Sequence, residues 1–335
     1  MILVTGGCGY IGSHCVISLL NQNKKVAVID NFVNSDKSVL KKINLISKKN
    51  ILFYKGDLRQ KSFLSDVFNK HNFETVFHFA GLKSLSESYK NPLEYFSANI
   101  NSTINLLQTM QKYKVYNLIF SSSATVYGQD HPLPWTEDIK LKFPESPYAQ
   151  SKAFIENLLL KYYQSDMNFK IGILRYFNPI GCHSSGLIGD RIDGSTNLIP
   201  SIMLYLLGKK PYLPIYGNDY KTKDGSGIRD YIHVDDLVNG HIGALKYIIE
   251  KKGIHIWNLG SGKGYSVFQI VSKFEEHYKK RIFKKVMPRR EGDLSEYWAD
   301  ISKAGKELNW SPSLDIDKMI LDSLNHLKKL KEANL

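Results

Sequence analysis

Residues 5–12 read Thr-Gly-Gly-Cys-Gly-Tyr-Ile-Gly, and this stretch decides the fold of the chain. Its glycines satisfy two overlapping spacings, Gly7-x-Gly9-x-x-Gly12 and Gly6-x-x-Gly9-x-x-Gly12. Glycine is needed where a chain turns tightly after a strand and where the backbone has to touch a pyrophosphate. The amides at the start of the next helix then point at that anion, so we expect a dinucleotide site here.

Working outward, the first 176 residues alternate short β-branched runs with helix-like segments. Strands are predicted at residues 2–5, 26–30, 51–55, 75–79, 117–121 and 170–176. Helices are predicted at residues 12–21, 35–47, 60–70, 92–112 and 147–164. Apolar strands separated by helices favour a parallel sheet covered on both faces. The fold class is therefore α/β, a Rossmann-type doubly wound sheet whose ligands bind at the carboxyl ends of the strands.

The alternation of strands and helices ends after residue 178, and residues 181–195 are predicted to form a loop. Further on, helices are predicted at residues 198–207, 234–249, 266–278 and 315–331, and a strand at 254–259. We therefore expect two domains. Residues 1–177 form the dinucleotide-binding domain that carries the catalytic residues. Residues 178–335 form mainly a smaller α/β substrate lobe, packed intimately on the first.

Acidic and backbone groups follow the next strands at their carboxyl ends. Asp30 ends the second predicted strand, 18 residues after Gly12. A carboxylate there accepts from both ribose hydroxyls and repels a 2′-phosphate, which favours NAD over NADP. A turn or cap residue is the alternative. Asp57 ends the third strand, where an adenine edge would lie, and residues 79–83 end the fourth.

The candidate chemistry lies on one helix and one strand end. Tyr148 and Lys152 are four residues apart, so they share a helix face. A cation beside a phenol favours the phenolate and predicts a pKa lowered from about 10 toward neutrality. Such a base beside a nicotinamide ring is what alcohol–ketone hydride transfer requires. Residues 121–123 (Ser-Ser-Ser) end the fifth strand in the same cleft, and spacing alone does not choose among them.

The glycine opening, the serine run and the Tyr-x-x-x-Lys pair resemble the extended short-chain dehydrogenase/reductase family. Within that family the chain is similar to the UDP-glucose 4-epimerases from Met1 to about Trp310. The longer motifs that carry the similarity are residues 79–83 (FAGLK), 121–128 (SSSATVYG), 174–179 (LRYFNP), 229–234 (RDYIHV) and 289–293 (RREGD).

This resemblance implies a reversible UDP-galactose/UDP-glucose interconversion through a 4-keto intermediate, on tightly bound NAD, in galactose metabolism. Tyr148 would be the base, Lys152 would tune it, and Ser123 would be the assisting serine. The family is usually homodimeric, and the helices at 92–112 and 147–164 could pair across a twofold axis. An isomerase with a UDP-sugar substrate is therefore expected.

Site residues follow from the same resemblance, position by position. It implies cofactor contacts at Gly6, Gly9, Tyr10, Ile11, Gly12, Asp30, Asn31, Asn34, Ser35, Asp57, Leu58, Phe79, Ala80, Gly81, Lys83, Ser123, Tyr148, Lys152 and Phe177. It implies substrate contacts at Ser123, Tyr148, Asn178, Asn197, Leu198, Tyr216, Arg229, Arg290, Asp293 and Tyr297. Tyr297 stands where a bulky residue narrows the sugar pocket, because broader members carry a small residue there. Unacetylated hexoses are therefore favoured.

Three departures and three alternatives accompany this interpretation. Residues 149–150 are Ala-Gln where the family commonly has glycine and a basic residue, Ala98 replaces an asparagine, and the loop 186–197 is one residue short. A dehydratase would need a carboxylate pair at residues 124–125, which are Ala-Thr. Epimerases for UDP-glucuronate or UDP-N-acetylhexosamines stay open. A non-catalytic NAD-binding regulator is disfavoured because Tyr148 and Lys152 are both present.

Composition narrows the remaining classes. The chain has 335 residues and a net charge of +13, but its lysines are spread in short runs, which indicates a basic surface and not a nucleic-acid site. Three cysteines form no disulfide or metal pattern. No apolar run approaches membrane-spanning length, and a strand beginning at Ile2 leaves no room for a signal peptide. We expect a cytoplasmic protein without metal, nucleic-acid or membrane partners.

Overall fold

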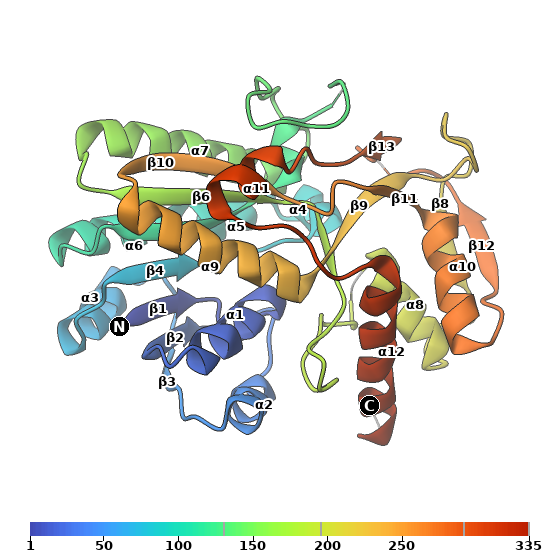
Figure 1. The fold of residues 1–335 in the computed structure, drawn as a ribbon, viewed down its shortest axis with the longest axis horizontal. Helices are drawn as coiled ribbons and strands as arrows, with labels where there is room; N and C mark the ends of the chain where they lie inside the picture. Colours follow the sequence, from blue (N-terminus) through green and yellow to red (C-terminus); the bar gives the residue numbers. More distant parts are fainter. Residues whose placement is uncertain (130, 195, 291, 334–335) are drawn as a thin grey trace.

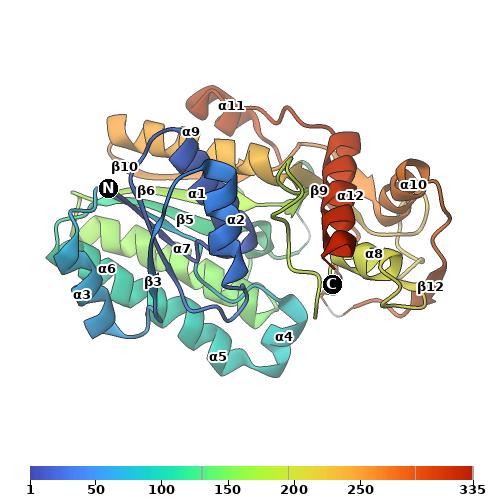
Figure 2. The same cartoon turned by 90° about the horizontal axis from the view of Figure 1, so that it is seen from below.

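The computed structural model describes residues 1–129, 131–194, 196–290 and 292–333 (Figure 1). A large parallel sheet with its helices occupies one side of the molecule, and a smaller lobe built from the later part of the chain occupies the other (Figures 1 and 2). Among the described residues, no helix combines the length and apolar character needed to cross a bilayer. The described part of the chain also holds no group of three or more metal-ligating side chains.

The large sheet has seven parallel strands in the order β10-β6-β5-β4-β1-β2-β3. Their bounds are β1 Ile2–Thr5, β2 Val26–Asp30, β3 Leu52–Lys55, β4 Thr75–His78, β5 Asn117–Ser123, β6 Lys170–Tyr176 and β10 Gly253–Leu259. Strand order reverses between β1 and β4, the switch point at which doubly wound sheets bind ligands. The predicted fold class is confirmed, with an additional strand at the β6 edge.

Two helical layers cover this sheet. One layer contains α1 Tyr10–Asn21, α2 Ser38–Ser47, α9 Val234–Glu250 and α11 Ser302–Leu308. The other contains α3 Lys61–Lys70, α5 Pro92–Phe96, α6 Ser102–Lys112 and α7 Pro147–Ser165. Strands β1, β2 and β4 are buried along their whole lengths, because both of their faces are covered by apolar helix surfaces.

The helix predicted at residues 92–112 is interrupted. A π-helical turn, Ser97–Asn101, separates α5 from α6. Such turns often mark functional sites. This one carries buried Asn99, whose side-chain oxygen accepts a hydrogen bond from the Leu82 amide at 2.8 Å. A short helix that the sequence did not indicate, α4 Leu85–Lys90, precedes it, with Ser84 as its N-cap.

The smaller lobe has its own core. Its helices are α8 Leu198–Leu206, α10 Val267–Tyr278 and α12 Ile316–Glu332, and a two-stranded parallel sheet joins β8 Leu213–Tyr216 to β12 Lys284–Met287. A second small sheet is centred on β9 Ile228–His233, which pairs with β7 Asn178–Ile180, β11 Gly264–Ser266 and β13 Glu296–Tyr297. Strand β9 is therefore the central strand of this second small sheet.

Strand β6 ends at Tyr176, but the large lobe continues in later parts of the chain. Strand β10 pairs with β6 from Gly253–Lys170 to Leu259–Tyr176, and α9 packs on the sheet beside α1. The chain thus leaves the large lobe after β6, builds part of the smaller lobe, and returns. The expected division at residues 1–177 and 178–335 holds for most of each lobe. The exceptions are β10, α9 and α11, which come from the second range but belong to the large lobe.

Candidate active site

The glycine turn between β1 and α1 is closely packed. Gly6 has φ +69°, and a Cβ added to it would lie 2.6 Å from the Ala80 backbone nitrogen. A Cβ on Gly12 would lie 2.2 Å from the Gly6 carbonyl oxygen. The turn therefore tolerates no side chain at either position, and it presses against the end of β4. Tyr10 opens α1, and its hydroxyl donates to the Gly181 carbonyl at 2.6 Å, linking the turn to the chain after β7.

Asp30 organises the loops around this turn. Its Oδ2 accepts from the Cys8 amide at 2.9 Å, and its Oδ1 accepts from the Phe32 amide and the Ser35 hydroxyl, both at 2.8 Å. The side chain is only 8% exposed. Asp30 thus holds the predicted cofactor segments 6–12 and 31–35 together, as the turn-residue alternative requires. The same carboxylate stands at the carboxyl end of β2, where a ribose contact was predicted.

The next strand ends bring further predicted residues to the same edge. Asp57 follows β3, and the hydrogen bond from Arg59 is the main cause that lowers the pKa of the Asp57 carboxyl. The side-chain Nδ2 of Asn31 donates to Asp57 Oδ2 at 3.3 Å. After β4, a Cβ added to Gly81 would lie 3.9 Å from Lys152 Nζ. The strand-end residues predicted to contact the cofactor therefore lie beside Lys152, one of the predicted catalytic residues.

Lys83 extends this edge toward the second lobe. Its ammonium contacts Asp190 Oδ1 at 2.8 Å and lies 5.8 Å from the centre of the Tyr10 ring. Because Lys83 is 54% exposed, this ion pair contributes little stability. Its position places a cation between the glycine turn and the loop after β7.

Tyr148 and Lys152 lie in the first two turns of α7. This helix begins at Pro147, with Ser146 as N-cap accepting from the Ala149 amide at 3.2 Å. Lys152 is 5% exposed, and its Nζ donates to the Ser121 carbonyl at 2.7 Å. Its ammonium lies 4.9 Å from the Phe120 ring centre. The end of β5 therefore holds the lysine directly.

The pKa of Tyr148 differs from the prediction made from spacing. Burial raises the pKa of this phenol, and its hydrogen bond to Ser123 acts in the lowering direction. Burial also lowers the pKa of Lys152 to about 8, while Glu156 acts in the raising direction. The expected lowering of the tyrosine pKa is wrong for this structure, because desolvation of the buried phenol outweighs its hydrogen bond to Ser123.

Ser123 is the serine that contacts Tyr148. Its hydroxyl oxygen accepts from the Thr125 hydroxyl at 3.0 Å and from the Thr125 amide at 3.3 Å. The 3₁₀ turn Ala124–Tyr127 follows immediately. Spacing left the three serines equivalent, and the tertiary structure separates them: Ser121 offers its carbonyl to Lys152, Ser122 faces away to Glu156, and Ser123 reaches the phenol.

The predicted nucleotide-anchoring residues form a second cluster, on β9 and the segment before β13. Asp293 accepts from Arg229 Nη2 at 3.0 Å through Oδ1 and from Arg290 Nε at 2.8 Å through Oδ2. The Arg290 guanidinium lies 4.9 Å from the Tyr216 ring centre. Arg229 is largely buried, whereas Arg290 is 39% exposed. Arg290 therefore presents positive charge to solvent.

Arg290 also reaches the start of α8. Its Nη1 donates to the Thr196 carbonyl at 3.3 Å, next to Asn197, the N-cap residue of α8, and Leu198, its first residue. An aromatic ring, two guanidinium groups and a helix N-terminus thus converge, as a uracil and a pyrophosphate require.

Tyr297 connects this cluster to the large lobe. Its ring stacks on Trp135, with centroids 5.0 Å apart and planes 9° apart, and the Arg229 guanidinium lies 4.8 Å from its ring centre. Its hydroxyl lies 3.4 Å from the Asn178 side chain. Phe177 is 6.0 Å away, centre to centre. Packing therefore holds the ring of Tyr297 in one place. Sequence reasoning missed Trp135, which lies in no local motif.

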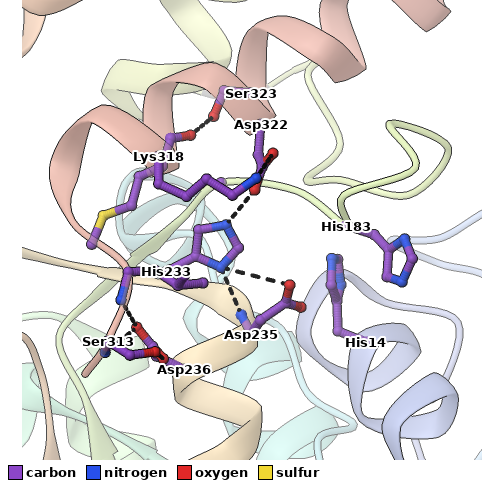
Figure 3. Close-up of polar contacts among 12 residues, drawn as sticks. His14, His183, His233, Asp235, Asp236, Ser313, Lys318, Asp322 and Ser323 are labelled. Carbon is purple, nitrogen blue, oxygen red and sulfur yellow. Dashed lines mark hydrogen bonds and ion pairs between the residues drawn. The ribbon is translucent and has the colours of Figure 1, made fainter. Parts of the chain in front are cut away.

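A polar contact behind β9 was also missed. His233 ends β9, and its Nδ1 accepts from the Asp235 amide at 3.0 Å, so its Nε2 carries the proton and donates to Asp322 at 3.1 Å. Lys318 Nζ donates to the other Asp322 oxygen at 2.7 Å. Figure 3 shows His233 between these aspartates, with Asp322 and Lys318 on α12. The C-terminal helix therefore anchors the strand that carries Arg229.

The residues at the switch point fit a dinucleotide. No side chain caps α1 and no acidic residue lies in its first turn, so its leading amides face an anion without competition. The glycine turn admits no side chain that would displace a pyrophosphate. Asp30 stands where a 2′-phosphate would be repelled. Residues of the turn, of the β2, β3 and β4 ends, and of α7 would hold NAD there.

Comparisons with known proteins agree with this site. The family model for GDP-mannose 4,6 dehydratase matches residues 3–323. The UDP-glucose 4-epimerase of Yersinia pestis is 45% identical over 323 residues, covering 96% of each chain. The solved structure of UDP-glucose 4-epimerase from Bifidobacterium longum in complex with NAD+ and UDP superposes with a TM-score of 0.95 at 42% identity, covering 98% of each chain.

A second solved structure is similar to this chain over the same length. The UDP-glucose-4-epimerase from Stenotrophomonas maltophila, with bound NAD and formylated UDP-arabinopyranose, has a TM-score of 0.96 at 39% identity and covers 99% of each chain. A dehydratase would need carboxylates after the serine run, where this chain has Ala124 and Thr125. The chain therefore belongs to the family described by the GDP-mannose 4,6 dehydratase model and, within it, to the UDP-glucose 4-epimerases.

Proposed function

We propose that this protein is an NAD-dependent UDP-glucose 4-epimerase that interconverts UDP-galactose and UDP-glucose in galactose metabolism. The observation that carries the proposal is the position of Tyr148 one helical turn before buried Lys152, whose Nζ donates to the Ser121 carbonyl at 2.7 Å, at the switch point of a dinucleotide fold. Relatives at 39–45% identity with the same name, two of them solved with NAD, support it.

In the proposed mechanism the Tyr148 phenolate, which has to form against the burial that raises the pKa of this phenol, takes the proton of the sugar 4-hydroxyl at Oη, and the Ser123 hydroxyl orients that oxygen. Held by the glycine turn and the ends of β2, β3 and β4, NAD would supply the reversible hydride acceptance that oxidation and reduction at carbon 4 need. Lys152 supplies positive charge beside the phenol. Arg290, Tyr216 and the start of α8 anchor the nucleotide while the sugar turns about its pyrophosphate linkage. Binding energy from the remote uridine thus retains the ketone during its rotation.

The direct test is to incubate the purified protein with UDP-galactose, without added NAD, and to assay for UDP-glucose. Conversion would establish both the reaction and a retained cofactor. Absence of conversion by protein shown to contain NAD would overturn the hexose assignment. UDP-glucuronate and UDP-N-acetylglucosamine would then be assayed in the same way.

Tyr297 is proposed to restrict the substrate to unacetylated hexoses. Its ring is held against Trp135 and Arg229, so it cannot swing aside for an N-acetyl group. We expect Tyr297→Ser to gain activity on UDP-N-acetylglucosamine of roughly tenfold or more, because the removed ring opens space for one small group. Initial rates on both sugars measure this. Equal exclusion of the acetylated sugar by the variant would show that another residue sets the limit.

We also propose a homodimer formed through α5 and α7. Leu93 on α5 is 82% exposed and Phe154 on α7 is 51% exposed, and α5 packs against α7. Burying such side chains against a second copy would remove an exposed apolar patch. Phe154→Arg is expected to convert the dimer into a monomer by light scattering after size exclusion. Phe283→Arg, at a 65% exposed phenylalanine of the other lobe, is the matched control and should stay dimeric.

The three cysteines are free and buried, which supports the expectation of a reducing, cytoplasmic environment.

A further inference from the structure

A buried carboxylate stands behind the catalytic pair. Glu156 lies on α7 one turn after Lys152 and two turns after Tyr148, so the three side chains follow one face of the helix. Glu156 is 2% exposed. A buried carboxylate is stable only when it is paired and hydrogen-bonded. None of the roles assigned above uses Glu156.

Its partners are on the two strands beneath α7. The Ser122 hydroxyl donates to Glu156 Oε1 at 2.5 Å. Arg175, which is 3% exposed, donates through Nε to Oε1 at 3.1 Å and through Nη2 to Oε2 at 2.7 Å. Ser122 and Arg175 are directly paired across β5 and β6. Both carboxylate oxygens are therefore occupied, and Glu156 fastens α7 to the ends of both strands.

Ser122 is the middle residue of the run that serves the catalytic pair. The carbonyl of Ser121 receives the Lys152 ammonium at 2.7 Å, and the hydroxyl of Ser123 contacts Tyr148. A hold on Ser122 thus fixes its two neighbours relative to α7, the helix that carries Lys152 and Tyr148. Misplacing such groups by about an ångström is enough to slow a reaction substantially.

The titratable and charged groups around Lys152 come from three elements, α7, β4 and β6. On α7 they are Glu156 and the phenol of Tyr148. On β4 stands His78, whose pKa is lowered to about 3 by burial and by Lys152, so this ring is neutral near pH 7. On β6 stands Arg175, whose positive charge lies on the far side of Glu156. Glu156 is the group that favours the charged form of Lys152 against burial.

We propose that Glu156 is a positioning residue of the reaction: by binding Ser122 and Arg175 it sets the serine strand end against α7, and it places a negative charge one turn from Lys152. This inference rests on the proposed function, in which Lys152 acts as a cation beside Tyr148. Glu156 itself touches no reacting atom. Its loss therefore acts through Lys152 and Ser123.

The test is Glu156→Gln, which keeps the shape of the side chain and removes its charge. In protein labelled with ¹³C-lysine, the NMR titration of Lys152, assigned with Lys152→Arg, is expected to move to lower pH by about one unit. The alkaline limb of the kcat profile should move in the same direction, because the lysine loses its proton earlier. This titration needs no substrate, so it stands even if the wild type fails to convert UDP-galactose, an outcome that would overturn only the proposed function.

Two further variants separate positioning from stability. Glu156→Gln/Arg175→Met removes both buried charges, so it leaves no unpaired guanidinium and should fold if the single variant does not. It is still expected to shift the Lys152 titration downward. Asp236→Asn, at another buried carboxylate bound to Ser313 and the Leu314 amide, is the matched control for lost stability and should leave the titration in place. An unshifted Lys152 titration in a folded variant lacking Glu156 would overturn the proposal.

Discussion

Replacing Tyr148 with phenylalanine is expected to slow conversion of UDP-galactose by about 10²–10⁴-fold, the usual contribution of a positioned acid–base group. The variant keeps the ring and removes only the hydroxyl that contacts Ser123. The proton of the sugar hydroxyl then has no acceptor beside it. Because binding of the uridine depends on the other cluster, KM should change much less than kcat. Initial rates over a range of UDP-galactose concentrations measure both constants.

A matched control is available on the same helix. Tyr163→Phe alters a partly buried tyrosine near the other end of α7 and should keep the wild-type rate. The NAD content and the thermal midpoint of both variants would be compared with those of the wild type. A Tyr148→Phe protein that retains NAD and turns over at the wild-type rate would show that another group is the base.

Stability is expected to fall steeply between pH 7.5 and pH 5.5. His14, His78 and His241 are at most 2% exposed. Burial lowers their pKa values to about 3, 3 and 4. In the unfolded chain these rings titrate near 6.5. Below that pH the unfolded state binds protons that the folded state excludes, so the free energy of unfolding decreases as the pH falls.

The magnitude follows from the linkage relation. One pH unit below 6.5, each excluded proton costs about 1.4 kcal/mol, so the three rings together cost roughly 4 kcal/mol. That is a large part of an ordinary folding free energy of about 5–15 kcal/mol. Asp230 acts in the opposite direction over a narrower range, because burial raises its pKa to about 6.

Urea unfolding followed by circular dichroism at pH 7.5 and pH 5.5 measures this loss. His14→Gln removes one titrating ring while retaining a donor for the Tyr10 carbonyl, which His14 Nδ1 contacts at 2.7 Å. The pH-dependent loss in this variant should be smaller by about a third, since two of the three rings remain. Equal stability of the wild type at the two pH values would mean that these rings accept protons in the folded state.

The local features were predictable from the sequence because their causes are local. The strands at residues 2–5, 26–30 and 170–176 were predicted to the residue, since apolar runs bounded by turn residues depend only on neighbours. The glycine turn was predictable for the same reason: Gly6 has φ +69°, and Gly12 has no room for a side chain beside the Gly6 carbonyl of the same segment. The four-residue spacing of Tyr148 and Lys152 likewise placed both on one helix.

Contacts between distant segments were decided only by the tertiary structure. The pairing of β10 with β6 joins residues about 80 positions apart, and no local pattern distinguishes a strand of the large sheet from one of the small lobe. The stacking of Trp135 on Tyr297 and the anchoring of His233 by Asp322 arise in the same way.

The ionisation of Tyr148 shows most clearly the difference between what the sequence determines and what the tertiary structure determines. The four-residue spacing of Tyr148 and Lys152 could be predicted, but whether the pKa of Tyr148 rises or falls depends on how much water burial removes and on its hydrogen bond to Ser123. The sequence alone determined the doubly wound fold and the dinucleotide turn and predicted which side chains react, because spacing and residue type specify them. Tertiary structure alone decided which serine reaches the phenol, which carboxylate supports the lysine, and how each group is charged, because desolvation and hydrogen bonding across segments arise only when the chain is packed.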